Sequence, residues 1–571
     1  MVDSNRYRTP VLVMLAVSAM VLTTTGQARR QVTDALLLNP PDDEWITYGR
    51  TYAEPHHSPL SDITAESVKR LGLAWSVEVG SQGKIETTPL MFDGVLYGTS
   101  TWSVVYAVDA RRGTLKWRWD PGLVRTGYVG SGPRFCCGPV NRGVALYQGK
   151  VYVGLLDGRL MALDAETGSP VWAVQTTPPN SDYSITGAPR VVKGQVIIGN
   201  GGGEYGTRGY VSAYDAATGE MKWRFYVVPG DPSKPFEDEA QARAAKTWTG
   251  QWWKYGGGGN PWDGIAFDPE LNLVYVGTGN GAPWNQNHRS PAGGDNLYLS
   301  SIVALDADTG ALKWYYQTTP GDNWDYNAAQ PMILADLTIG SQLRKVIMQA
   351  PKNGYFYVID RVTGALISGQ AFAYQSWTTG IDMETGRPKE LEAARYRFTP
   401  VRLSPSAVGA HHWPPMAFNP TTGLVYYPGQ ETSMAYTMEE KFEFKEGQWN
   451  VGIRRGSQAP PAPPPDPNAP PMAGFFVAWD PIAQKARWRL PFQPSGGALS
   501  TAGQLIFVGN NGGALLALDP LTGATLWQHQ MLQGVATPIT YKLDGRQYVA
   551  VMSGTSAGRV FAFAVDASST P

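Results

Sequence analysis

The stretch VALDADTGALKW (303 to 314) holds the pattern that decides the fold. An apolar alternation ends at Asp306, a Thr-Gly pair follows, and Trp314 stands eight residues after the aspartate. This order predicts a strand, a tight turn and a second strand that carries the tryptophan. Gly310 suits the left-handed position of the turn, and the Asp306 side chain can accept hydrogen bonds from backbone amides within it.

The same phrase returns along the chain. Clear copies are YAVDARRGTLKW (106 to 117), MALDAETGSPVW (161 to 172), SAYDAATGEMKW (212 to 223) and LALDPLTGATLW (516 to 527), with weaker ones at 357 to 368 and 477 to 488. A further strand pair precedes most copies, and four short strands per unit at a spacing of roughly 40 to 55 residues are typical of propeller blades. Seven copies are visible, and AFNPTTGLVYYPG (417 to 429) is interpreted as part of one more. We therefore predict an all-β, eight-bladed β-propeller with tryptophans docked between blades.

Composition supports this prediction and excludes one class of partner. The 571 residues include 65 glycines, 44 prolines, 20 tryptophans and 28 tyrosines, spread through short apolar stretches, so we expect little helix. The formal charge is -1 with both signs interspersed. Such a chain offers no footprint for a phosphate backbone, and nucleic acid is not an expected partner.

Two segments lie outside the blade pattern. Residues 1 to 28 join a basic start, an apolar run and small residues up to Ala28, which predicts an export signal, with an uncleaved membrane anchor as the alternative. The remainder, 29 to 571, is expected to be a single propeller domain. The proline-rich segment 457 to 472 cannot pair in a sheet and is predicted to be an extended surface loop, a spacer or docking arm being the alternative.

Three polar residues have no role in building blades. Glu204, Asn280 and Asp325 each follow a strand or lie in a connection, where loops gather at one end of a propeller's central channel. Carboxylate and amide oxygens suit calcium, which takes six to eight of them, so a ligand would have to complete the shell. From spacing alone, Glu204 is equally explained as a turn carboxylate and Asn280 as a left-handed turn residue.

Four motifs together resemble the pyrroloquinoline quinone (PQQ) dependent alcohol dehydrogenases, the quinoprotein methanol and ethanol dehydrogenase family. They are the adjacent cysteines followed by Val-Asn-Arg-Gly, the Gly-Gly-Glu-Tyr-Gly stretch, Gly-Asn-Gly-Ala-Pro-Trp-Asn, and Trp-Asp-Tyr. The resemblance runs from Trp45 to nearly the end of the chain. It is closest to the quinohaemoprotein branch of the family, whose members carry an extra cytochrome domain.

The resemblance implies a function and site residues. Glu204, Asn280 and Asp325 match the calcium-binding positions, and Asp325 also matches the catalytic base that takes the hydroxyl proton while hydride passes from the alcohol carbon to PQQ, giving an aldehyde. Lys352 matches the cation at the reactive quinone oxygen, with a solvated surface lysine as the alternative. The remaining cofactor-holding positions match Glu86, Arg142, Thr186, Gly202, Gly203 and Trp262, the last as the indole beneath the PQQ ring.

The only cysteines of the chain, Cys136 and Cys137, are adjacent. Neighbouring Cα atoms lie about 3.8 Å apart, below the usual disulfide range, so a bond between them closes a strained eight-atom ring. The resemblance implies this disulfide as the cover on the second face of PQQ. Two free buried thiols are the alternative.

The chain also departs from the family. Asn327 stands where lanthanide-using relatives have an Asp, which favours calcium. Pro494 stands where many relatives have a Trp that touches the cofactor, and His411-His412 where relatives often show an Asn that bonds it. No Cys-x-x-Cys-His motif occurs, so electrons are expected to leave to a separate cytochrome c in the periplasm.

We therefore predict a periplasmic PQQ- and calcium-dependent enzyme that oxidises an alcohol. The alternative is a non-catalytic propeller of the outer-membrane assembly type, which uses the same blade phrase but has no use for this set of polar residues. A homodimer is left open by the sequence, and so is the identity of the alcohol.

Overall fold

The computed structural model describes residues 1, 30 to 125, 135, 137 to 179 and 181 to 567. By its internal contacts the chain divides into two units, Met1–Gln31 and Val32–Pro571. All the helices and strands described below belong to the second unit. Within the described residues, no helix is long and apolar enough to cross a membrane.

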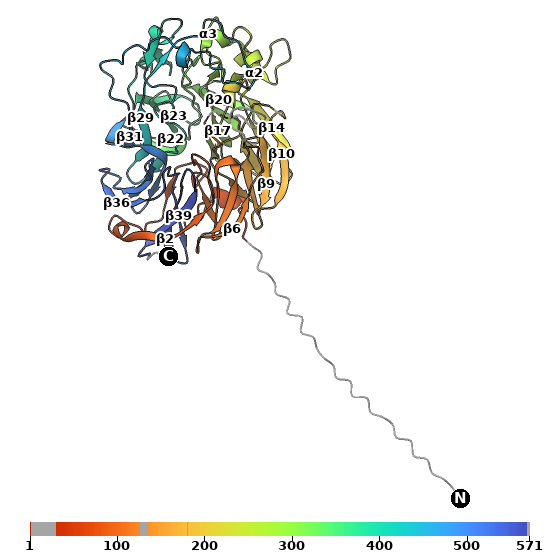
Figure 1. The fold of residues 1–571 in the computed structure, drawn as a ribbon, viewed down its shortest axis with the longest axis vertical. Coiled ribbons are helices and arrows are strands. Elements are labelled where there is room, and N and C mark those ends of the chain that lie inside the picture. Colours follow the sequence, from red (N-terminus) through yellow and green to blue (C-terminus); the bar gives the residue numbers. More distant parts are fainter. Residues whose placement is uncertain (2–29, 126–134, 136, 180, 568–571) are drawn as a thin grey trace. The chain divides into compact units, whose positions relative to one another are not determined.

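Eight antiparallel sheets of four strands form the blades of a propeller (Figure 1). The first three blades are β3 (Leu90–Phe92), β4 (Val95–Thr99), β5 (Val105–Asp109) and β6 (Thr114–Trp119); β7 (Ala145–Tyr147), β8 (Lys150–Gly154), β9 (Arg159–Asp164) and β10 (Pro170–Gln175); and β11 (Arg190–Val192), β12 (Gln195–Ile198), β13 (Tyr210–Asp215) and β14 (Met221–Tyr226). The next two are β16 (Ile265–Asp268), β17 (Leu273–Gly277), β19 (Ser301–Asp306) and β20 (Leu312–Gln317); and β21 (Ile333–Ile339), β22 (Gln342–Gln349), β23 (Tyr355–Asp360) and β24 (Leu366–Ala371).

The last three blades complete the ring. They are β28 (Ala417–Asn419), β29 (Leu424–Glu431), β31 (Ala473–Asp480) and β32 (Lys485–Pro491); β33 (Pro494–Thr501), β34 (Leu505–Asn510), β35 (Ala514–Leu518) and β36 (Thr525–Gln530), extended by β1 (His57–Ser58); and β37 (Ile539–Leu543), β38 (Arg546–Ser553), β39 (Arg559–Val565) and β2 (Leu71–Glu78). In Figure 1 the red-orange β2 lies beside the blue β39, with which it pairs. An early strand therefore closes the last blade.

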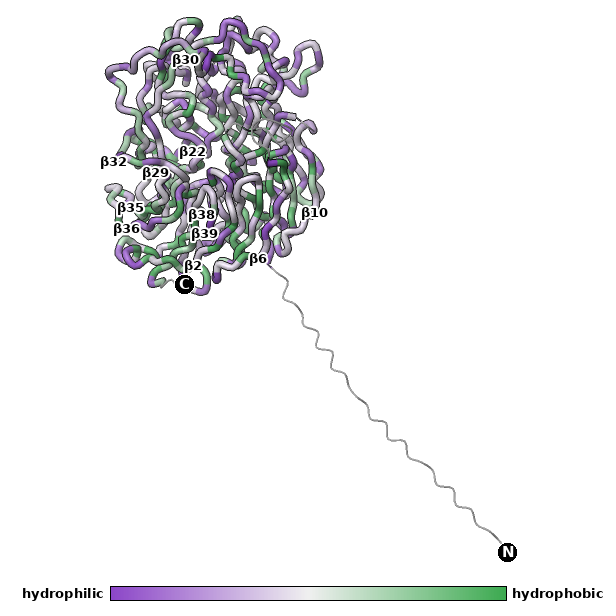
Figure 2. The backbone as a smooth tube through the Cα atoms, viewed as in Figure 1, coloured by the Kyte–Doolittle hydropathy of each residue, from purple (hydrophilic) through white to green (hydrophobic). Residues whose placement is uncertain are grey.

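The remaining elements are short. Three two-stranded ribbons are β15 (Gly257–Gly258) with β18 (Gly281–Ala282), β25 (Thr378–Ile381) with β26 (Pro388–Glu390), and β27 (Val401–Leu403) with β30 (Met434–Tyr436). The α-helices are α1 (Asp34–Leu38), α2 (Glu239–Ala245) and α3 (Gln286–Arg289). The expectation of little helix is thus confirmed for the described part of the chain. Figure 2 shows hydrophobic segments along the strands around β38 and β39.

The repeated phrase works as predicted. Asp306 accepts hydrogen bonds from the amides of Asp308 and Thr309, and Gly310 has φ 71°. Indoles donate to a backbone carbonyl of the next blade in six places: Trp75 to Ala110, Trp117 to Ala165, Trp172 to Ala216, Trp223 to Ala307, Trp488 to Pro520, and Trp527 to Leu71. Six of the eight junctions between blades are thereby fastened by a hydrogen bond, whereas the indole nitrogen of Trp314, on the fourth blade, is buried without a partner among the described residues.

One detail of the blade count was wrong. The stretch 417 to 429 is not part of a separate blade, because β29 pairs along its length with β31, which begins the weak copy at 477 to 488. A long insertion separates the halves of this sixth blade. The eighth blade is instead the one closed by β2, whose strands come from both ends of the domain. In the described part of the insertion, residues 459 to 472 form no helix or strand.

Candidate active site

The predicted site residues lie in two kinds of connection. Glu86, Arg142, Thr186, Trp262 and Asp325 lie between the last strand of one blade and the first strand of the next. Gly202, Gly203, Glu204, Asn280 and Lys352 lie between the second and third strands of a blade. Because successive strands are antiparallel, both kinds of connection emerge at the same end of the propeller.

These connections surround one cavity of about 620 Å³. It is lined by Glu86, Cys137, Arg142, Thr186, Gly202, Gly203, Glu204, Trp262, Asn280, Asp325 and Lys352, so the structure brings all the described members of the predicted site together. Cys136 lies outside the described residues, and its bond to Cys137 therefore stays a prediction. Pro494, Asn327, His411 and His412 line the same cavity.

One part of the cavity is cationic and aromatic. The Arg142 guanidinium donates to Thr186 Oγ1 at 2.7 Å, pairs with Glu86 at 2.7 Å, and lies 4.8 Å from the centre of the Trp262 ring. Lys84, which the sequence did not single out, pairs with the other oxygen of Glu86 at 3.2 Å. A flat indole beside two cations is a suitable surface for a planar anion.

A second part of the cavity gathers oxygen ligands. Asn280 Nδ2 donates to Glu204 Oε1 at 3.0 Å, and the Trp284 indole donates to the same oxygen at 3.2 Å. The Glu204 backbone is held as well, because its carbonyl accepts a hydrogen bond from the amide of Asn450. Ligation of a metal by the Asn280 amide oxygen would require this amide group to turn over.

Asp325 is a buried carboxylate that lines the cavity and is paired with Lys352. Lys352 Nζ donates to its Oδ2 at 2.9 Å and to the carbonyl of Ala407 at 2.9 Å. Burial raises the pKa of Asp325 to about 8, against the lowering effect of the Lys352 ammonium and with a further rise from Glu204. Its backbone has φ 70°, a left-handed conformation that a non-glycine residue adopts at some cost and that is frequent at functional sites.

Asp322 fixes the loop that carries Asp325, and sequence reasoning missed it. Its carboxylate accepts hydrogen bonds from the amides of Trp324, Tyr326 and Gly281. The Gly281 bond links this loop to the one that presents Asn280. The sequence signal was present, since Asp322 belongs to the same GDNWDYN motif, but which of its two aspartates faces the cavity depends on the fold.

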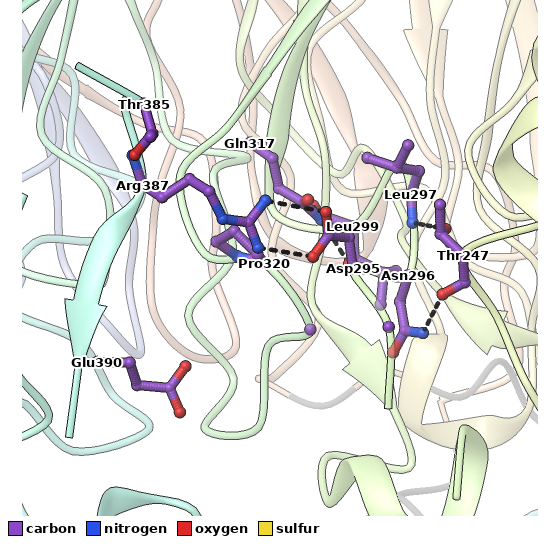
Figure 3. Close-up of polar contacts among 12 residues, drawn as sticks. Thr247, Asp295, Asn296, Leu297, Leu299, Gln317, Pro320, Thr385, Arg387 and Glu390 are labelled. Atoms are coloured by element: carbon purple, nitrogen blue, oxygen red, sulfur yellow. Dashed lines mark hydrogen bonds and ion pairs between the residues drawn. The ribbon is translucent and has the colours of Figure 1, made fainter. Parts of the chain in front are cut away.

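The same loop is braced from outside. Arg395 donates to the carbonyls of Gly321 and Pro320 and pairs with Glu390. Figure 3 shows a neighbouring contact, in which both terminal nitrogens of Arg387 point at the carboxylate of Asp295. Through Glu390 on β26 and Arg395, the ribbon formed by β25 and β26 is connected to the loop that carries Asp325.

Gly202 and Gly203, directly before Glu204, lie against neighbouring loops too closely for any side chain. Gly202 has φ 106°, and a Cβ atom there would lie 2.4 Å from the carbonyl oxygen of Asp182. A Cβ on Gly203 would lie 2.9 Å from Asn260 Oδ1. The backbone can therefore approach Asp182 and Asn260 this closely only because both residues are glycines.

The residues present fit a planar polycarboxylate with an adjacent cation. The cavity has the size of a cofactor site. Asn260 Oδ1, which lines the cavity, is buried, and no described residue donates a hydrogen bond to it, as expected where a ligand or water completes the set. Arg142 Nε is directed instead at Asp263 Oδ2, 3.5 Å away. Among the described residues, no group of three or more His, Cys, Asp or Glu side chains is arranged to hold a metal, so an ion would depend on Asn280 and on the ligand itself.

A propeller with a buried charged cavity at one end of its channel, holding a strained carboxylate against a lysine, belongs to the class of cofactor-dependent enzymes. The chain matches the family model "PQQ: Glucose/ethanol/alcohol dehydrogenase, beta-propeller domain" over residues 45–369 and 477–549. It is 53% identical to quinohemoprotein alcohol dehydrogenase ADH IIB of Pseudomonas putida, over 90% of this chain and 73% of that protein. The chain belongs to the family of PQQ-dependent alcohol dehydrogenases.

Two further relatives agree with this assignment. The 1-butanol dehydrogenase (cytochrome c) of Thauera butanivorans is 42% identical over 95% of this chain and 77% of its own length. The solved structure of quinohemoprotein alcohol dehydrogenase ADHIIG from Pseudomonas putida HK5 superposes with a TM-score of 0.89 at 45% identity, covering 95% of this chain and 83% of that one. The predictions of family, fold and enzyme class are confirmed, which sets aside the non-catalytic scaffold.

Proposed function

We propose that this enzyme oxidises primary alcohols with apolar chains to aldehydes, using PQQ together with calcium, in the periplasm, and passes the electrons to a c-type cytochrome. The observation that carries the proposal is the single cavity, in which cations and the Trp262 indole adjoin Glu204, Asn280 and Asp325. PQQ, when bound, supplies the two-electron acceptor.

The residues of the chain would divide the work as follows. Arg142, Lys84 and Lys352 offer positive charge to the carboxylates and quinone oxygens of the cofactor, and Trp262 offers a stacking surface. Glu204, Asn280 and Asp325 would supply oxygen ligands to calcium, which needs more ligands than these three. Asp325 Oδ2, held by Lys352, is the atom proposed to accept the hydroxyl proton.

The mouth of the cavity supports the choice of substrate. Val408 and Trp449, which line it, are 57% and 37% exposed, and Met434 and Phe135 line it as well. An apolar chain would be buried against these side chains. Each added methylene then contributes about 0.8 kcal/mol, which predicts that kcat/KM rises by up to about fourfold per methylene from ethanol to 1-butanol.

The electron acceptor and the location rest on other support. The relative from Thauera butanivorans is named for cytochrome c, which supports such an acceptor here. The predicted export signal at 1 to 28, outside the described residues apart from Met1, supports the periplasm. Cell fractionation and the rate of cytochrome c reduction by purified enzyme test these two points.

The central test is reconstitution of the purified protein with PQQ, with and without calcium, followed by dye reduction with a series of alcohols. Turnover should require both additions. Asp325→Asn should still bind PQQ, measured by quenching of tryptophan fluorescence, but lose at least about a thousandfold in kcat. Asp308→Asn, an exposed aspartate paired with Lys193, is the control and should keep full activity. Full turnover by Asp325→Asn would refute its role as the base.

A further inference from the structure

The imidazole of His412 is stacked on the indole of Trp262. The ring centres are 5.3 Å apart and the planes differ by 19°. Both side chains line the cavity. Flat rings at this separation attract each other when offset. Part of the surface that Trp262 could offer to a flat ligand is therefore held by a side chain of the protein itself.

The backbone around His412 is fixed on both sides. The neighbouring His411 is buried, with its ring nitrogens 2.6 Å and 2.9 Å from the carbonyl oxygens of Ala350 and Pro414. The amide of Ala410 donates to the carbonyl of Lys352 at 3.0 Å. These contacts hold the backbone of residues 410 to 414, so the side chain of His412 can move without it.

The imidazole of His412 has few attachments. No described residue forms a hydrogen bond with either of its ring nitrogens, and the stack on Trp262 is the ring contact that it makes in the described part of the chain. Burial, together with the nearby charges of Lys352, Lys84 and Arg142, holds the pKa of His412 well below the usual value. A neutral ring does not compete with these three cations for an anionic ligand.

We infer that His412 is a displaceable cover of Trp262, whose imidazole leaves the indole when PQQ binds. The inference rests on the proposed function for the identity of the cofactor. PQQ can stack on the indole only in those molecules in which the imidazole has turned away. The fraction of such molecules limits the observed rate constant of PQQ association. His412 therefore controls how fast PQQ enters the site and does not take part in the reaction.

The first test measures PQQ association with the cofactor-free protein, in the presence of excess calcium, by stopped-flow quenching of tryptophan fluorescence. His412→Ala and His412→Asn remove the stack and should raise the association rate constant by about three- to tenfold, the range that loss of one stacking contact spans. His529→Ala is the matched control, because His529 is also stacked on a tryptophan, Trp527, at 6.1 Å and 13°, but on the outer strand β36. It should leave the rate unchanged.

The second test does not use catalysis or binding rates. The chain has six histidines, so their ring protons can be resolved by NMR after histidine labelling, and His412→Asn assigns the relevant signal. In the cofactor-free protein this signal should be displaced by the Trp262 ring current, and saturation with PQQ should move it. If PQQ binds, but His412→Ala does not change its association rate constant or the His412 signal does not move, the inference is wrong and the proposed function is unaffected. Failure of PQQ to bind would refute both the inference and the proposed function.

Discussion

At the scale of single residues, Asp322 shows how one buried carboxylate arranges the side chains of others. It receives three backbone amides and joins the loop of Asp325 to that of Asn280. Asp322→Asn keeps the shape but places an amide nitrogen or a weaker acceptor opposite these donors. We expect a loss of about 2 to 3 kcal/mol in the free energy of unfolding and at least about a tenfold weaker affinity for calcium.

Urea unfolding of the cofactor-free protein and calcium titration of the PQQ-saturated protein measure these two effects. Asp308→Asn, on the surface, should change stability by less than about 0.5 kcal/mol. If Asp322→Asn retained the calcium affinity of the unaltered protein, the link between the two loops would not matter for the metal.

The residues proposed to carry the chemistry could be selected from the sequence, and those that orient them could not. Glu204, Asn280 and Asp325 attracted notice because blades do not need them. Asp322, Lys84 and Trp284 have ordinary roles in isolation, as a loop carboxylate, a lysine and a core aromatic. Their function depends on contacts with groups far away in the sequence, as with Trp284 and Glu204, which only the fold brings together.

At the scale of elements, the docking of tryptophan on glycine between blades gives a sharp prediction. Gly168 has φ 73°, and a Cβ atom on it would lie 2.6 Å from the Trp117 ring. Gly122 has nearly the same φ, 68°, with no atom within 4 Å of such a Cβ. Gly122→Ala should therefore cost only the left-handed conformation, about 1 kcal/mol, whereas Gly168→Ala should cost about 3 kcal/mol or more.

Chemical denaturation of the two variants measures the difference. Equal losses would mean that the indole moves aside freely and that the contact between Trp117 and Gly168 contributes little to holding the blades together.

The range of the interactions explains why the blades could be predicted from the sequence and the pairing of β29 with β31 could not. The Asp, Gly and Trp of the phrase act within one turn or on the adjacent blade, so their spacing is visible in the sequence. The pairing of β29 with β31 spans the insertion from 432 to 472, and the spacing of the repeated phrase carries no information about it.

At the scale of the whole molecule, buried histidines link stability to pH. Burial, aided by Arg190, lowers the pKa of His56 to about 3, whereas in the unfolded chain it is about 6.5. Between these values the unfolded chain binds a proton that the folded protein does not. The contribution of His56 is thus complete above about pH 6.5 and falls by about 1.4 kcal/mol per unit as the pH drops below it.

Other groups act in the opposite direction, since burial raises the pKa of Glu54 to about 7 and that of Asp263 to about 6. A difference measurement isolates the histidine. His56 alone lowers the free energy of unfolding by about 2 kcal/mol when the pH falls from 7 to 5, and His56→Gln should abolish this part of the pH dependence. An unchanged pH dependence in this variant would show that His56 becomes protonated in the folded protein as readily as in the unfolded chain.

The pairing of β2 with β39 also sets an order of events during synthesis. Residues 71 to 78 leave the ribosome long before their hydrogen-bonding partner, residues 559 to 565, has been made. Until that partner has been made, the nascent chain carries an unpaired strand edge at each end of an incomplete ring, which is the kind of surface that aggregates or recruits chaperones. The ring can therefore close only after residues 559 to 565 have left the ribosome.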